Sequence, residues 1–110
     1  MQTIKLKKPL TVNGKEYKEL SYDLDELTAY DMDRAGKLLK DDGSFVNIIE
    51  LDAGYHFRIF CVAVTKQHSD IDMTDLVRLN GRDFVRAVKA VRNFFVEDSA
   101  ESSPETTAGE

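Results

Sequence analysis

Residue types that build crosslinks and catalytic centres are scarce in this chain. Its 110 residues include one cysteine, so no disulfide can form within the chain. That cysteine, Cys61, lies in the apolar stretch "RIFCVAV", which is typical of a small core residue. A nucleophilic cysteine needs a nearby base and a lowered pKa. Only His56 and His68 are available as imidazole bases, and we interpret Cys61 as a core residue.

Long apolar runs, a basic excess and nucleotide-binding motifs are also missing. No apolar run reaches the roughly 20 residues that a membrane-spanning helix requires. The first residues lack the basic-then-apolar pattern of a secretory signal, so we expect a cytoplasmic protein. The formal net charge is -5 at pH 7, which disfavours nonspecific binding to nucleic acid or anionic membranes. The absence of a phosphate-binding glycine motif gives no reason to expect a cofactor.

The composition nevertheless indicates one globular domain followed by a different kind of segment. Apolar residues make up 42% of the chain, which is ordinary for a globular protein. After Val96 the sequence changes to "EDSAESSPETTAGE", which has no large apolar residue. Such a segment cannot bury enough surface to offset its ordering entropy. We therefore expect a domain over 1–96 and a disordered acidic tail over 97–110.

The N-terminal stretch "TIKLKKPLTVNGKEYKELSYDL" predicts a β-hairpin over 2–24. Apolar and polar residues alternate on both sides of Asn13-Gly14, which is the strongest short-range signal for a two-residue hairpin turn. Pro9 lacks a backbone N–H, so its strand is expected to lie at an edge or to break near it.

The register of this hairpin requires an irregularity. A continuous pairing would place the apolar residues of the two strands on opposite faces. One extra residue near positions 18–19 restores a common face, so we predict a β-bulge there. The repaired register pairs Ile4 with Leu24 and Leu6 with Tyr22.

Three later stretches have the apolar spacing of helices. We place them at about 28–41, 53–67 and 80–96. Thr28 and Asp31 form a capping-box pattern with aspartate in place of glutamate, and Asn80 and Asp83 repeat it. Asp52 can cap the middle helix. The length of the segment 53–67 favours a helix, although its β-branched and aromatic residues are also compatible with a strand.

The connections and the last helix complete the expected fold. "SFVNIIELD" favours a short helical turn and "IDMTDLVRLNG" a single turn of helix. In the last helix we expect this stripe to face the core: Phe84, Val85, Val88, Val91, Phe94 and Phe95. The sequence thus predicts an α+β fold in which an N-terminal hairpin packs on three to four helices.

Two clusters of polar residues invite a chemical interpretation. "QHSDID" offers His68, Asp70 and Asp72 as metal ligands, but a polar loop commonly has this composition and no second His or Cys is near. We therefore assign no metal site and no catalytic residue. Cations at helical spacing form a stripe comprising Arg78, Arg82, Arg86 and Lys89. A solvated helix face, a docking surface for an acidic partner helix and a phosphate-binding stripe all remain open.

The order of these features resembles the phage tail assembly chaperones of the Mu-like and P2-like type. The N-terminal resemblance lies in the strand, turn, second strand and helix start of "IKLKKPLTVNGKEYKELSYDLDELTAYDMDRA". The later part is similar in its apolar central helix around Cys61, its connector leucine Leu76 and its closing helix with Phe84 and Phe94. The resemblance covers most of 3–96, and residues 44–54 have no clear counterpart.

The resemblance implies a non-enzymatic role in building a phage or prophage tail. Such chaperones bind the long tape measure protein, keep it soluble and help to recruit tail tube subunits, and they are absent from the finished virion. Self-association is a further expectation. Our candidate contact residues are Tyr30, Phe45, Tyr55, Arg82, Arg86 and Lys89. The alternative is a small nucleic-acid-binding regulator that uses the Arg/Lys stripe.

Overall fold

An N-terminal β-hairpin and four helices make up the part of the chain that the structure describes, which confirms the α+β class. The computed structural model describes the backbone over residues 1–41 and 52–107, and the side chains over 1–40 and 52–96. The elements are β1 (Gln2–Val12), β2 (Lys15–Tyr22), the short 3-10 helix η1 (Leu24–Glu26), α1 (Ala29–Asp41), α2 (Ala53–Gln67), α3 (Met73–Leu76) and α4 (Gly81–Thr107). The predicted turn in "SFVNIIELD" lies outside these residues, apart from Asp52 at its end.

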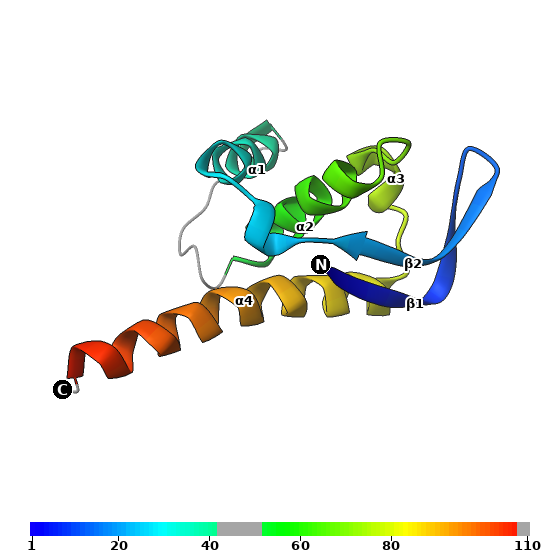
Figure 1. Ribbon diagram of the computed structural model, residues 1–110. Helices are drawn as coiled ribbons and strands as arrows, with labels where there is room; N and C mark the ends of the chain where they lie inside the picture. Colours follow the sequence, from blue (N-terminus) through cyan, green and yellow to red (C-terminus); the bar gives the residue numbers. More distant parts are fainter. Residues whose placement is uncertain (42–51, 108–110) are drawn as a thin grey trace.

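Helix α2 is the centre of the molecule. It packs against α1, α3, α4 and β2, so most of its circumference is covered (Figure 1). A helix that is apolar nearly all round is stable only when it is buried in this way. Asp52 begins it, because its side chain accepts a hydrogen bond from the backbone N–H of Tyr55 at 2.9 Å. The prediction of a helix rather than a strand over 53–67 is confirmed.

The hairpin turn forms as predicted, but the register beyond it does not. Asn13 and Gly14 both take positive φ, at 51° and 83°, as a two-residue hairpin turn requires. Farther from the turn, Ile4 pairs with Leu20, whereas Leu24 was expected opposite it. The register shifts between the Lys5–Glu19 and Leu10–Tyr17 pairs, so the break lies beside positions 18–19 as predicted, but the extra residues are in β1 and the predicted extra residue in β2 is wrong.

A carboxylate on α4 explains why β1 departs from regular pairing. Asp83 is fully buried and accepts hydrogen bonds from the backbone N–H of Lys7, at 2.9 and 3.0 Å, and of Lys8, at 3.1 Å. Pro9, next in sequence, has no N–H to donate. The backbone of Lys7 and Lys8 therefore bonds to helix α4, the register of the hairpin shifts between Lys5 and Leu10, and the hairpin bends beyond them (Figure 1).

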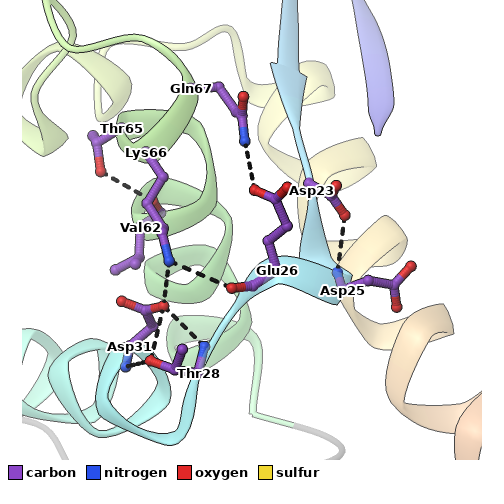
Figure 2. A network of polar contacts seen from close by, with 9 residues as sticks. All are labelled: Asp23, Asp25, Glu26, Thr28, Asp31, Val62, Thr65, Lys66 and Gln67. Carbon is purple, nitrogen blue, oxygen red and sulfur yellow. Dashed lines mark hydrogen bonds and ion pairs between the residues drawn. The ribbon is translucent and has the colours of Figure 1, made fainter.

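A second polar network fixes the start of α1 to the end of α2. The predicted capping box is confirmed: Thr28 N–H donates to Asp31 Oδ2 at 2.9 Å, and Asp31 N–H donates to Thr28 Oγ1 at 3.2 Å. Figure 2 shows Lys66 reaching from α2 to this carboxylate, at 2.7 Å, and to the carbonyl oxygen of Glu26, at 3.4 Å. Gln67 adds a hydrogen bond to the Glu26 carboxylate at 3.3 Å.

This network predicts a dependence of stability on pH. The hydrogen bonds from Lys66 and Thr28 lower the pKa of Asp31 below its ordinary value of 3.8. A lowered folded pKa stabilises the protein above that value, and the contribution is lost as the pH falls through the folded pKa. We expect Asp31→Asn to lower the free energy of unfolding by about 1 kcal/mol at pH 7 and by progressively less below pH 3.8.

Urea unfolding at several pH values, followed by circular dichroism, measures this difference. Asp33→Asn is the matched control, because Asp33 pairs with Lys37 while both side chains are largely exposed. An effect of Asp31→Asn that is constant across the pH range would contradict the assignment.

Helix α4 begins as predicted but is longer than predicted. The Asn80 side chain accepts from the backbone N–H of Arg82 at 2.9 Å, so Asn80 is the N-cap. The capping-box role predicted for Asp83 is wrong, since this side chain bonds to β1. The helix continues to Thr107, past the expected end at 96, and projects beyond the other elements (Figure 1). The residues after Val96 can bury little apolar surface, but they include glutamate and alanine, which have a high local helix propensity. The division into a domain over 1–96 and a tail stays a prediction.

Candidate partner-binding surface

The residues considered for metal binding have structural partners. His68 Nε2 accepts from the backbone N–H of Ser21 at 3.1 Å. Asp70 accepts a hydrogen bond from the Tyr17 hydroxyl, which lowers the pKa of Asp70 and raises that of Tyr17. Asp72 precedes α3, and its backbone N–H donates to Asp75 at 2.9 Å. Within the described residues, no group of three His, Cys, Asp or Glu side chains is placed to hold a metal ion.

Cys61 has the environment of a core residue. Its side chain is 1% exposed, and burial raises the pKa of its thiol to about 12. The thiol therefore stays protonated at neutral pH, whereas a nucleophile must be a thiolate. Cys61 borders a hollow of about 270 Å³ that Asp72 and Arg34 also line. The described lining contains no histidine or second thiol that could act with Cys61.

The aromatic residues proposed as contacts differ in position. Tyr30, on α1, is 75% exposed and is available to a partner. Tyr55 was named as a candidate contact residue but is only 7% exposed, because its ring packs near Gly36 and its hydroxyl donates to the carbonyl of Met32 at 3.3 Å. Phe45 lies outside the described residues. Tyr55 is therefore not part of the surface considered below.

The basic stripe divides into two pairs with different roles. Arg78 donates to the carbonyl oxygen of Thr11 and to Asp75, both at 3.0 Å. Arg86 donates to Asp83 at 2.9 Å and to the carbonyl oxygen of Lys5. These two arginines hold the hairpin against α3 and α4.

The other two cations of the stripe, Arg82 and Lys89, are exposed. No ion pair is recorded for either of them within the described side chains. They remain available for a partner. The spacing in the sequence indicated four cations for such a contact, and two of them instead bind the hairpin.

Three exposed valines lie directly after α3 or on α4. Val77, directly after α3, is 58% exposed, and Val85 and Val96 of α4 are 59% and 45% exposed. Val85 and Val96 are 11 residues apart, so they lie within about 20° of each other around the helix. The core side of α4 instead carries Ala87 and Val91, both fully buried. The prediction that Val85 faces the core is wrong.

Two hollows adjoin these valines. One, of about 300 Å³, is lined mainly by apolar residues that include Phe57, Leu76, Val77 and Phe84. The second, of about 440 Å³, runs along α4. Its described lining consists of Val85, Val88, Lys89, Arg92, Asn93 and Val96.

These hollows form one surface. Phe84 of the first hollow and Val88 of the second are one helical turn apart, so the hollows are neighbours along α4. We call the area around Val77, Val85, Val88, Val96, Lys89 and Arg92 the α3–α4 surface. An exposed apolar area with a charged rim is typical of a protein-binding site.

Lys89 was named from the sequence, whereas the valines and Arg92 were missed. The signal was present in the width of the apolar stripe. Apolar residues at 84, 85, 88, 91, 94, 95 and 96 cover more of the helix circumference than one core contact requires. The sequence alone does not say which edge of that stripe faces solvent.

Comparison with known protein families identifies the family of this chain. Residues 3–96 match the family model described as "Phage tail assembly chaperone proteins, E, or 41 or 14". No curated protein and no solved structure matches the chain. Among the helices of the described residues, none has the length and apolar character needed to cross a membrane.

Proposed function

Because the chain belongs to the phage tail assembly chaperone family, we propose that it is a non-enzymatic chaperone that binds a tape measure protein and keeps it soluble during tail assembly. The observation that carries this proposal is the family match over 3–96. The exposed valines of the α3–α4 surface support it, because a chaperone for long apolar helices needs accessible apolar contacts.

The proposal includes where the protein acts and what else it meets. We place it in the cytoplasm of the bacterial host and outside the mature virion, with tail tube subunits as further partners. Self-association would multiply weak contacts along a long client without making any single contact stronger. The buried, protonated Cys61 and the structural roles of His68 and Asp70 support a function in binding.

Co-expression with the tape measure protein of the same phage or prophage tests the proposal. We expect a larger soluble fraction of that client and its co-purification with the tagged chain, because bound apolar segments cannot aggregate. A compact, soluble phage protein similar in size to the tape measure protein serves as the control client and should not co-purify. A tape measure protein that stays equally insoluble and does not co-purify would refute the proposal.

A further inference from the structure

The α3–α4 surface has the dimensions of a helix-binding groove. Val85 and Val96 are separated by about 16 Å along α4, which corresponds to about three turns of a partner helix. Val88 lies between them in the same hollow, and Val77 lines the neighbouring hollow together with Phe84. A helix that meets such a row needs apolar side chains every three or four residues.

The charged residues among the described lining of these two hollows are all basic. Lys89 and Arg92 line the hollow along α4, Arg58 lines the hollow beside Val77, and no described lining residue of either hollow is acidic. This bias is notable because the whole chain has 20 acidic and 15 basic residues. Within the described side chains, Lys89 and Arg92 take part in no recorded ion pair. Carboxylates on a partner would complement them.

We propose that the α3–α4 surface is the client-binding site and that it takes an amphipathic helix with an apolar stripe flanked by carboxylates. This rests on the proposed chaperone function and specifies the chemistry of the client segment. The apolar stripe of the client covers Val77, Val85 and Val96, and its flanking carboxylates meet Lys89 and Arg92.

Two other occupants fit the surface less well. A nucleic acid would place phosphates near Lys89 and Arg92 but would leave the exposed valines without apolar partners. A second copy of this chain, pairing through the same surface, would bring the Lys89 and Arg92 side chains of both copies together. Like charges in an interface are costly. An acidic amphipathic helix satisfies both the apolar and the charged groups.

The first experiment uses two synthetic peptides and the full chain. Each peptide has about 18 residues, with leucines spaced three and four apart on one face and with flanking residues that are either all glutamate or all lysine. Fluorescence anisotropy measures binding at low and moderate salt. We expect the glutamate peptide to bind at least about tenfold more tightly than the lysine peptide. A glutamate peptide with scrambled leucine positions should bind weakly.

Surface variants then locate the site. The double variant Val85→Ser/Val96→Ser should weaken the binding of the glutamate peptide by at least about tenfold, because it removes the apolar contacts. The double variant Lys89→Glu/Arg92→Glu should reverse the preference and select the lysine peptide. That reversal is a gain of binding, so loss of folding cannot mimic it. Lys18→Glu reverses the charge of an exposed residue elsewhere and is the matched control.

Several outcomes would overturn this inference. One is equal binding of the glutamate and lysine peptides. Another is binding of the glutamate peptide that the surface variants leave unchanged. A third is displacement of the glutamate peptide by duplex DNA that binds the charge-reversed variant less tightly than wild type. A stable dimer that Val85→Ser/Val96→Ser dissociates would also overturn it, because the second copy would then be the occupant.

Co-expression of the same variants separates this inference from the proposed function. If the tape measure protein is kept soluble by wild type and by both double variants, the function stands and the assigned surface is wrong. If the peptides show the reversed preference but the client stays insoluble, the surface stands and the function is wrong.

Discussion

Replacing Asp83 with alanine is expected to lower the free energy of unfolding by about 3 kcal/mol, a large fraction of the stability of a domain of this size. The Asp83 carboxylate is fully buried and accepts from the backbone N–H groups of Lys7 and Lys8 and from Arg86. Its removal leaves these donors without their acceptor at a position where β1 has already left its pairing with β2.

The charge of Asp83 matters as well as its shape. Burial by itself raises the pKa of this carboxyl, but the hydrogen bonds from Lys7, Lys8 and Arg86 outweigh burial and hold it below 3.8. Its contribution to stability is therefore present above that value and is lost as the pH falls through the folded pKa. Asp83→Asn keeps one acceptor oxygen and should be less destabilising than Asp83→Ala at neutral pH.

Urea unfolding of the three proteins measures these differences. Asp33→Ala is the control, because its carboxylate is 66% exposed and its pairing with Lys37 is expected to contribute less than about 1 kcal/mol. Equal stability of Asp83→Ala and wild type would show that water replaces the carboxylate, and the explanation of the hairpin register would then fail.

Most features that depend on neighbouring residues were predicted from the sequence, and the exception is the capping box at Asp83, whose side chain bonds to β1 instead. The Asn13-Gly14 turn, the Thr28–Asp31 capping box and the Asp52 cap all formed where expected. Each involves residues within three positions of each other, so the chain needs no distant partner to form it. The family resemblance over most of 3–96 came from the order of such local features and is confirmed by the family match.

Features that depend on distant residues were not predicted. The register of β1 is set by Asp83, which is 76 positions after Lys7 in the sequence. The orientation of α4 is set by which side packs against α2 and β1, and that choice buries Ala87 and exposes Val85. The candidate surface follows from this orientation, so its valines became recognisable only once the helix was placed.

Phe60→Ala is expected to lower the free energy of unfolding by about 3–5 kcal/mol. Phe60 is fully buried on α2, and its ring lies against Tyr22 of β2, with ring centroids 5.3 Å apart. Because other elements surround α2, they cannot easily close the cavity that a missing ring leaves. If this variant does not fold, Phe60→Leu should fold and be destabilised by about 1 kcal/mol.

Val85→Ala is the matched control, and the comparison separates the residues that hold the fold from those that bind. Val85 is 59% exposed, so its truncation should change the free energy of unfolding by no more than about 0.5 kcal/mol. Urea unfolding of both variants measures the contrast, and a larger effect for Val85→Ala than for Phe60→Leu would contradict the packing described here. If truncation of Val85 changes stability little but weakens client binding, the role of Val85 lies in the complex. We expect this pattern for the exposed valines of the α3–α4 surface.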